Sequence, residues 1–214
     1  MNHVASHDIV KRLAIYLNYL KTRPENGPAN ITPEKLGEAV GVASGQITAD
    51  LIPVGTECHP KIGYITEYLI ADIEHALGYD NVDRAILVGA GHLGKAVLSY
   101  KGFNHYGLHI VAAFDTNPNL IGTEVNGIPV YGMEQMTQIC EDFGVHIGII
   151  TAPADFAQGI ADQMIACNIR GIWNFAPTYL KVPENILVEN ENIADSLVVL
   201  SRRLADVIIE EIVQ

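Results

Sequence analysis

The stretch Val88-Gly89-Ala90-Gly91-His92-Leu93-Gly94 decides how the second half of this chain folds. A GxGxxG spacing alone is a weak signal, but these glycines follow a short apolar strand predicted over 85–88 and open a helix predicted over 92–101. An acidic residue, Asp115, stands 21 positions beyond Gly94, directly after the next apolar segment. This order of strand, glycine loop, helix, strand and acid is typical of a dinucleotide-binding unit.

The three glycines of the loop have separate physical roles. Gly89 permits the tight turn, Gly91 lets the backbone approach a pyrophosphate, and Gly94 allows the helix to pack closely on the strand. The helix start offers free N–H groups and a partial positive charge to phosphates. The expected cofactor-binding residues of the loop are therefore Gly89, Ala90, Gly91, His92, Leu93 and Gly94.

Asp115 indicates which dinucleotide binds. Its carboxylate can accept hydrogen bonds from the ribose hydroxyls of adenosine, whereas it would repel a 2′-phosphate. The residues that follow it, 116–118, offer no arginine to such a phosphate. NAD and NADH are therefore favoured over their phosphorylated forms. A domain that has lost its ligand, or that binds another adenosine cofactor such as coenzyme A, remains an alternative.

Two further segments are expected at the cofactor. Thr151, Ala152 and Pro153 end the strand predicted over 147–150, and the carboxyl ends of parallel strands line the ligand crevice. Phe175 follows the strand predicted over 171–173 and could lie near the nicotinamide. Core packing is the commoner role of such a phenylalanine.

Residues 81–190 continue the alternation of strand and helix. Continuous apolar strands separated by helices indicate an α/β fold with a doubly wound parallel sheet, a Rossmann domain. Strands are predicted at 85–88, 110–114, 128–130, 147–150, 171–173 and 186–188, and helices at 92–101, 133–143 and 155–167.

Residues 1–80 have a helical pattern instead. Thr32-Pro33-Glu34 is a good helix start, and Gly41 ends that helix. Ser44 can cap the next helix, which runs to about Leu51, so the pair forms a helix-turn-helix. Residues 52–65, rich in proline and glycine, suit a two-stranded wing before a last helix. This pattern favours a winged-helix domain, although small helical packing domains look similar.

Residues 191–214 predict one long helix. Its apolar residues repeat with a 4-3-4-3 spacing that makes a heptad seam, formed by Ile193, Leu197, Leu200, Leu204 and Val207. Such a narrow stripe packs on a partner or another domain, and a plain core helix is the alternative.

Composition excludes several classes of protein. Of the 214 residues, 49% are hydrophobic and 18% charged, and no run of about 18 apolar residues exists to span a membrane. The N-terminus lacks an apolar leader, so we expect a cytoplasmic protein. The three cysteines, an odd number without CxxC, argue against a disulfide framework and a zinc ribbon, and no metal site is predicted.

Catalysis is not expected. About 100 residues follow Asp115, and they are needed to complete the sheet and the last helix, so no substrate domain fits. A small helical domain joined to an NAD domain favours sensing over turnover. A small NAD-dependent oxidoreductase is the least favoured alternative.

The chain resembles the Rex family of redox-sensing transcriptional repressors along essentially its whole length. The matching segments are Arg12-Leu13 with Tyr16; the loop 88–94 with Ala96, Tyr100 and Gly102-Phe103; Ala113-Phe114-Asp115 with Pro118 and Ile121-Gly122; Gly127-Ile128-Pro129-Val130; Pro153-Ala154 with Ala157-Gln158; and Gly171-Ile172-Trp173-Asn174-Phe175-Ala176-Pro177 with Val182-Pro183.

The resemblance implies a homodimer that binds inverted-repeat operator DNA while NADH is scarce. NADH would close the dimer and release the DNA, and the terminal helix would be swapped between subunits. The implied domains are a winged helix (1–80), a Rossmann domain (81–190) and a C-terminal dimerisation helix (191–214). The implied switch residues are Arg12, Tyr100 and Asn192, where Asn192 replaces the aspartate of the family.

The implied DNA-binding residues are Ser44, Gln46, Thr48 and Lys61, and here the chain departs from the family. An arginine pair before an aspartate is missing from 46–50, and His59-Pro60 replace basic wing residues. One arginine–base contact discriminates by about 1–3 kcal/mol, so four losses per dimer could remove most of a specific-binding window of about 4–10 kcal/mol. Residues 1–80 also carry a net charge of −4.

Two hypotheses follow from this departure. The chain is either an NAD(H)-binding redox sensor of the Rex type, a transcriptional repressor that responds to the NADH/NAD ratio, or a Rex paralogue that binds NAD(H) but has lost operator binding and acts through another DNA site or a protein partner. Cys58, within the predicted wing, permits the further idea of a thiol switch.

Overall fold

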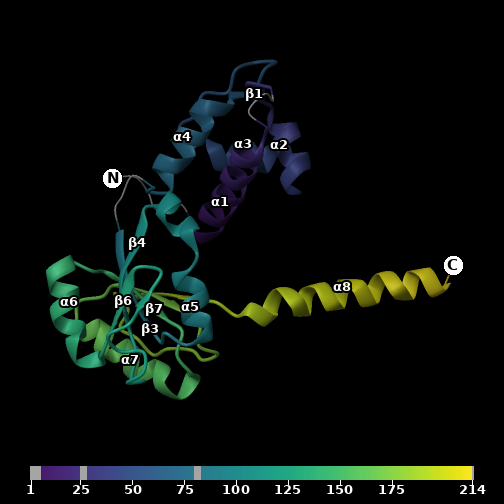
Figure 1. Ribbon diagram of the computed structural model, residues 1–214. Coiled ribbons are helices and arrows are strands. Elements are labelled where there is room, and N and C mark those ends of the chain that lie inside the picture. Colours follow the sequence, from purple (N-terminus) through teal and green to yellow (C-terminus); the bar gives the residue numbers. More distant parts are fainter. Residues whose placement is uncertain (1–5, 25–27, 80–82, 214) are drawn as a thin grey trace. The chain divides into compact units, whose positions relative to one another are not determined.

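The computed structural model describes residues 6–24, 28–79 and 83–213 and divides the chain into two compact units, 1–81 and 82–214 (Figure 1). The boundary predicted between residues 80 and 81 lies outside the described residues. Within the described residues, no helix combines the length and the hydropathy that a bilayer crossing requires.

The first unit consists of four helices and a small antiparallel sheet. The helices are α1 (His7–Thr22), α2 (Pro33–Val40), α3 (Ser44–Leu51) and α4 (Thr66–Ala76), and the strands are β1 (Asn30–Ile31) and β2 (Tyr64–Ile65). They enclose an apolar core made of Leu13, Tyr16, Leu17, Leu20, Ile31, Leu36, Ile47, Leu51, Tyr64, Leu69 and Ile73. Burial of this stripe, more than intrinsic propensity, stabilises such short helices.

The helix-turn-helix forms largely as its sequence predicts. The Thr32 hydroxyl accepts a hydrogen bond from the Lys35 amide at 3.4 Å, and Gly41 ends α2 with a φ of 72°. The predicted cap of α3 is wrong, because Ala43 is the N-cap residue and Ser44 is already helical. The Ser44 carbonyl instead accepts a hydrogen bond from the Thr48 hydroxyl at 3.1 Å.

The wing differs from its prediction. Residues 52–65 contain one strand, β2, and its partner β1 precedes α2 rather than following α3. An isolated bridge between His59 and Gly63 closes the tip, where Lys61 has a φ of 72°. Pro53 and Pro60 lack the backbone donors that a longer two-stranded ladder would need.

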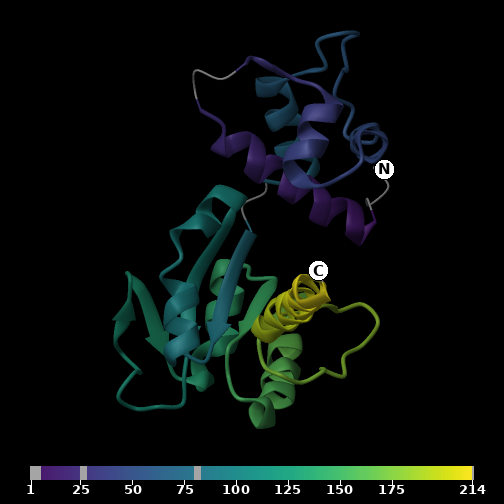
Figure 2. The same cartoon turned by 90° about the vertical axis from the view of Figure 1, so that its right-hand side faces the viewer.

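The second unit is built on a seven-stranded sheet in the order β5-β6-β4-β3-β7-β8-β9. Figure 2 shows the strands and helices of this unit, in teal and green, from a second side. Neighbouring strands are parallel except for the β5–β6 hairpin. The strands are β3 (Asp83–Val88), β4 (Leu108–Phe114), β5 (Glu124–Val125), β6 (Ile128–Tyr131), β7 (Ile147–Ile150), β8 (Gly171–Asn174) and β9 (Leu187–Asn190). Helices α6 (Met136–Phe143) and α7 (Ala154–Ala166) pack on one face and α5 (His92–Leu98) on the other, so the sheet is doubly wound as predicted.

Three local features of this unit were not predicted. The helix expected over 92–101 ends at Leu98, where the Ser99 hydroxyl donates to the Lys95 carbonyl at 2.6 Å, and a 3-10 helix, η1 (Lys101–Tyr106), follows. The hairpin turns at Asn126-Gly127, with φ values of 52° and 80°. A short 3-10 helix, η2 (Met133–Gln135), also precedes α6.

The last helix, α8 (Ile193–Val213), leaves apolar side chains in solvent. Among the heptad positions, Leu197, Leu200 and Leu204 are 66%, 62% and 55% exposed, respectively. The side chains of Ile193 and Val207 lie outside the described set. A seam this exposed is not the surface of a plain core helix.

Candidate dinucleotide site and recognition helix

A cavity of about 560 Å³ opens at the carboxyl ends of the central strands. Its lining includes the predicted residues Gly89, Gly91, Asp115, Thr151, Ala152 and Pro153, together with Val88, Thr116 and Met133. The rest of the lining comes from one face of α7, formed by Asp155, Phe156, Gly159, Ile160 and Gln163. Sequence reasoning missed this face, although its spacing of three and four residues is that of a helix side turned toward the crevice.

The glycines of the loop explain why the cavity has room. Gly89 has a φ of 105°, and a Cβ there would come within 2.9 Å of the Ala152 nitrogen. A Cβ on Gly94 would lie 1.9 Å from the Gly89 carbonyl oxygen, so α5 can approach the loop only with glycine at this position. A Cβ on Gly91 would meet nothing within 4 Å, which leaves that side of the backbone open to a ligand.

Asp115 is fixed at the edge of the cavity by the backbone. One carboxylate oxygen accepts from the Ala90 amide and the other from the Asn117 amide, each at 2.8 Å. The Thr151 hydroxyl ties β7 to the same loop by donating to the Gly89 carbonyl at 2.8 Å. Hydrogen bonds within the chain therefore join the strand ends to the glycine loop.

The charges around the cavity are unusual for a phosphate site. Among the described residues that line it, two are acidic, Asp115 and Asp155, and none is lysine or arginine. Phosphate groups must therefore be met by backbone N–H groups at the glycine loop rather than by cationic side chains. Such a site tolerates a bridging pyrophosphate and disfavours an additional phosphate on the ribose.

The other predicted loop residues do not line the cavity in this structure. Ala90 is buried and Leu93 packs into the core beneath α5. His92 is exposed at the first position of α5.

Phe175 and Tyr100 belong to a row of aromatic rings. The rings of Phe175 and Trp173 lie 4.5 Å apart, those of Trp173 and Phe103 5.8 Å, and those of Phe103 and Tyr100 4.9 Å. The Phe175 ring thus packs against its own domain and is not part of the described cavity lining. Tyr100 is 55% exposed at the end of this row, so its ring is accessible to a ligand or a partner.

Arg12 is engaged inside the first unit. Its Nε and Nη2 donate to the two carboxylate oxygens of Asp50 on α3 at 2.6 and 2.7 Å. Asp50 is 1% exposed and also accepts from the Tyr16 hydroxyl at 2.8 Å and from Gln46 Nε2 at 2.7 Å. Hydrogen bonding from Arg12 holds the pKa of Asp50 below its usual value, although burial acts in the opposite direction. This network anchors α3 to α1.

The remaining switch residue, Asn192, stands at the start of α8. Its Oδ1 accepts from the Ala194 amide at 3.1 Å, and its Nδ2 donates to Asp195 at 2.5 Å. It therefore caps the helix. Arg12 belongs to the first unit and Tyr100 and Asn192 to the second, so their grouping as a switch stays a prediction.

The DNA-binding candidates lie on and near α3. Ser44 and Thr48 are partly buried, whereas Gln46 is exposed but hydrogen bonded to Asp50. Lys61 is exposed at the tip of the wing. Helix α3, with the sequence SGQITADL, carries no lysine or arginine.

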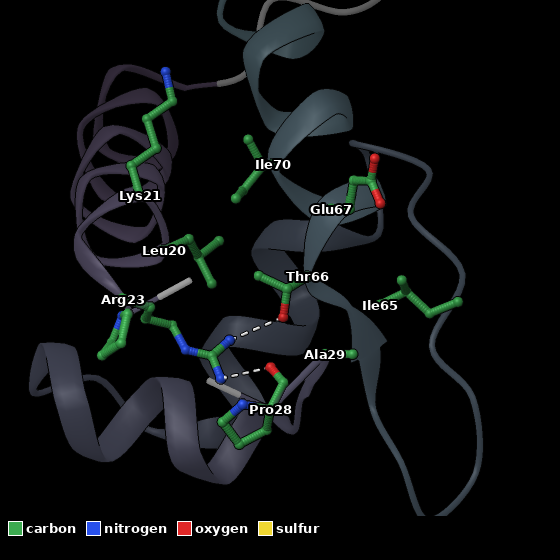
Figure 3. Close-up of a pocket in the computed structure, with 10 residues that line it drawn as sticks. Leu20, Lys21, Arg23, Pro28, Ala29, Ile65, Thr66, Glu67 and Ile70 are labelled. Atoms are coloured by element: carbon green, nitrogen blue, oxygen red, sulfur yellow. Dashed lines mark hydrogen bonds between the residues drawn. The ribbon is translucent and has the colours of Figure 1, made fainter. Parts of the chain in front are cut away.

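A second cavity, of about 470 Å³, lies in the first unit at the end of α1 and the start of α4 (Figure 3). Arg23 crosses it, and its two terminal nitrogens donate to the Thr66 hydroxyl at 2.9 Å and to the Pro28 carbonyl at 3.0 Å. These bonds tie the segment before β1 to the start of α4. The arginine is thereby used for structure, which argues against a separate anion site.

Two family models match the chain. A model described as "Putative DNA-binding protein N-terminus" covers residues 6–51, and one described as "CoA binding domain" covers residues 80–178. The Redox-sensing transcriptional repressor Rex of Bacteroides fragilis is 38% identical over 195 residues, which cover 91% of this chain and 89% of that protein. The chain belongs to the Rex family. The Rex of Clostridium beijerinckii is likewise 38% identical over 192 residues, covering 90% of this chain and 91% of the other.

Solved structures of a Rex-family repressor resemble this chain over nearly its whole length. The Rex-family repressor RSP has a TM-score of 0.88 with 33% identity, covering 98% of both chains. RSP in complex with β-NADH has a TM-score of 0.90 with 32% identity, covering 99% of this chain and 100% of that one. RSP with β-NAD⁺ and operator DNA has a TM-score of 0.87 with 33% identity, covering 98% of this chain and 96% of that one.

The predicted resemblance to Rex, and the winged-helix and Rossmann architecture, are therefore confirmed. Because the relatives are named as transcriptional repressors, the prediction of a regulator rather than an enzyme is also confirmed.

Proposed function

We propose that this chain is an NAD(H)-responsive transcriptional repressor of the Rex type. The observation that carries the proposal is the cavity between the glycine loop and β7, with the Asp115 carboxylate tied to the Ala90 amide at its edge. NADH or NAD occupies this cavity, and operator DNA is bound by α3 and the wing of the first unit. The protein acts in the cytoplasm.

The cavity suits NAD(H) better than related cofactors. The pyrophosphate lies over Gly91, where the backbone is open, and meets the N–H groups at the start of α5. Each oxygen of Asp115 keeps a lone pair beyond its one backbone bond, so the carboxylate can still accept from the ribose hydroxyls. A 2′-phosphate, or the 3′-phosphate of coenzyme A, would face this negative charge without a cation among the lining residues. Coenzyme A, suggested by the name of one family model, is therefore the weaker ligand.

We assign the three parts of the chain as the resemblance implies. Residues 1–80 bind DNA, 81–190 bind the dinucleotide, and 191–214 join two copies into a homodimer through the exposed seam of α8. Exchange of this helix between subunits would bury Leu197, Leu200 and Leu204. NADH then drives release of DNA because it binds one dimer shape more tightly than the other, with Arg12, Tyr100 and Asn192 as the switch.

A second candidate function is an NAD(H) sensor without operator binding. The observation that favours it is the lack of lysine and arginine in α3, together with the net charge of −4 on residues 1–80. The solved complex of RSP with operator DNA favours the repressor, because the present chain matches it over 98% of its length.

Fluorescence anisotropy of a labelled Rex-type operator duplex at low salt tests the proposal. We expect specific binding without nucleotide, release by NADH, and little response to NADPH or coenzyme A. Binding no stronger than that of a scrambled duplex would favour the sensor without operator binding. Release by coenzyme A but not by NADH would contradict the cofactor assignment.

A variant pair sharpens this test. Gly91→Val places a side chain where the pyrophosphate is expected and should weaken NADH binding by about tenfold or more, a loss of about 1.4 kcal/mol or more. DNA binding should survive, but NADH should no longer release it. His109→Ala, an exposed change on β4 outside the cavity lining, is the matched control and should behave like the unaltered protein.

A further inference from the structure

Helix α3 presents an exposed face that is almost free of polar groups. Gly45, Ala49 and Ile52 follow one another at intervals of four and three residues, so they share one side of the helix, and all three are exposed. The opposite side, with Ile47, Asp50 and Leu51, is buried. Ile52, which follows the last residue of α3, is 73% exposed and continues this apolar side beyond Ala49.

Two polar residues border this face, and both are bonded within the chain: the Thr48 hydroxyl donates to the Ser44 carbonyl at 3.1 Å, and Gln46 is bonded to Asp50. The Gln46 amide donates to Asp50 at 2.7 Å, and Asp50 is itself fixed by Arg12 and Tyr16. This bond uses one of the two amide N–H groups and directs the Gln46 side chain along α3 toward the buried Asp50. The face that meets a partner is therefore formed by the Ala49 methyl group and the Ile52 side chain.

No feature of the fold requires a glycine at position 45. Its φ is not positive, and a Cβ there would meet nothing within 4 Å. Gly45 lies in the first turn of α3, and no contact in the described chain requires a glycine there. A surface outside the chain that approaches the backbone closely would account for it.

We propose that α3 reads duplex DNA through thymine methyl groups, with Ala49 and Ile52 as the apolar contacts and Gly45 permitting close approach of the helix. The proposal rests on the proposed function, in which α3 enters the major groove as the second helix of a helix-turn-helix. Thymine is the base that presents a methyl group there, and small apolar side chains recognise it. The predicted site therefore selects thymine, rather than guanine, at the positions beneath α3.

Duplex DNA is a better fit to this face than a protein. Residues 6–51, which include most of this face, match the family model for a DNA-binding N-terminus. The exposed Lys61 at the wing tip can meet a phosphate beside the groove. A helix without cations reads bases with few phosphate contacts, so its affinity should depend weakly on salt compared with an arginine-bearing helix.

Selection from a random duplex library by the full chain, without NADH, tests the inference. We expect enriched half-sites with thymine at the contacted positions. Replacing one such thymine by deoxyuridine removes only the methyl group and should weaken binding about fourfold, the ratio that corresponds to about 0.8 kcal/mol for one buried methylene. Ile52→Ala should abolish this methyl effect at one position, whereas Ile15→Ala, an exposed apolar change on α1, should leave it intact.

Two more variants separate recognition from folding. Gly45→Ala should raise the melting temperature and yet weaken DNA binding, a combination that a merely structural glycine would not give. Thr48→Arg with Ala49→Arg, which supplies an arginine pair before Asp50, should shift the enriched sites from thymine toward guanine.

The outcomes distinguish the two levels of the proposal. Enriched sites that tolerate deoxyuridine at every thymine, or that contain guanine beneath α3, overturn the methyl readout while the repressor function stands. If no sequence is enriched although the same protein binds NADH in a separate assay, both the methyl readout and the repressor function are overturned. That result would point to a protein partner. Gly45→Ala with unchanged DNA affinity removes the close approach from the proposal.

Discussion

Two glycines, Gly94 in the dinucleotide loop and Gly45 in α3, show how differently the two units of this chain are determined. A Cβ on Gly94 would lie 1.9 Å from the Gly89 carbonyl oxygen, so the fold itself requires the glycine. A Cβ on Gly45 would meet nothing within 4 Å, so the fold does not. The cofactor site is built from contacts inside the chain, whereas the recognition surface is shaped by what it binds.

The largest expected effect on stability comes from a side chain at position 94, where α5 lies close to the Gly89 carbonyl oxygen. Gly94→Ala should destabilise the second unit by about 3 kcal/mol, the upper range for an overpacked site, and abolish NADH binding. Gly91→Ala should weaken NADH binding with little change in stability, because its Cβ meets no protein atom. Fluorescence of Trp173, the single tryptophan, reports unfolding of this unit. A Gly94→Ala protein as stable as Gly91→Ala would contradict the packing argument.

A smaller effect is expected in the first unit from Asp50→Asn. The buried carboxylate would lose its charged hydrogen bonds, which should cost about 2 kcal/mol of unfolding free energy. Hydrogen exchange of peptides from α1 and α3 should accelerate, while the unfolding midpoint seen by Trp173 stays unchanged. Glu38→Gln, an exposed change on α2, is the control. Equal exchange in both variants would show that the network does not stabilise α3.

The lowered pKa of Asp50 predicts that the stability of the folded chain depends on pH. Because the pKa of Asp50 is lowered in the folded chain, its contribution to stability is fully present above the ordinary carboxyl pKa of 3.8 and declines as the pH falls through and below that value. The difference in thermal stability between the unaltered chain and Asp50→Asn should therefore shrink when melting is followed from pH 6 down to pH 3. A difference that is constant over this range would contradict the sign of the shift.

The smallest effect concerns Lys61 at the wing. If its side chain meets one phosphate, Lys61→Ala should reduce the slope of log affinity against log salt by about one unit per subunit, with little change in sequence preference. Lys35→Ala, on α2, offers a comparison at an exposed lysine elsewhere in the first unit. An unchanged slope would remove Lys61 from the DNA interface.

Sequence patterns predict local structure well where one residue determines the backbone. Thr32 caps α2, Gly41 ends it, and the loop at 89–94 has the geometry that its glycines require. They fail where the end of a helix has no local signal or where a partner strand is distant. Helix α5 ends at Leu98, although the Ser99 amide and hydroxyl both donate to the Lys95 carbonyl, and β2 pairs with a strand more than thirty residues earlier.

The residues of the dinucleotide site likewise include some that the sequence could locate and others that it could not. Strand ends and glycines could be located from order along the chain, because parallel strands bring their carboxyl ends to one edge. The α7 residues that line the cavity, Phe156 and Gln163 among them, could not be assigned, since their pattern is also that of an ordinary amphipathic helix. The anchoring of α3 through Arg12 and Asp50 joins residues 38 positions apart and has no local signature.

The exposed seam of α8 makes this regulator sensitive to its own abundance. In the proposed homodimer, α8 buries Leu197, Leu200 and Leu204 only against a second copy, so the fraction of competent molecules would follow mass action. Halving the amount of protein would then lower operator occupancy by more than half near the association threshold. The cell could therefore adjust its response to NADH by changing expression of the sensor, without altering the nucleotide site.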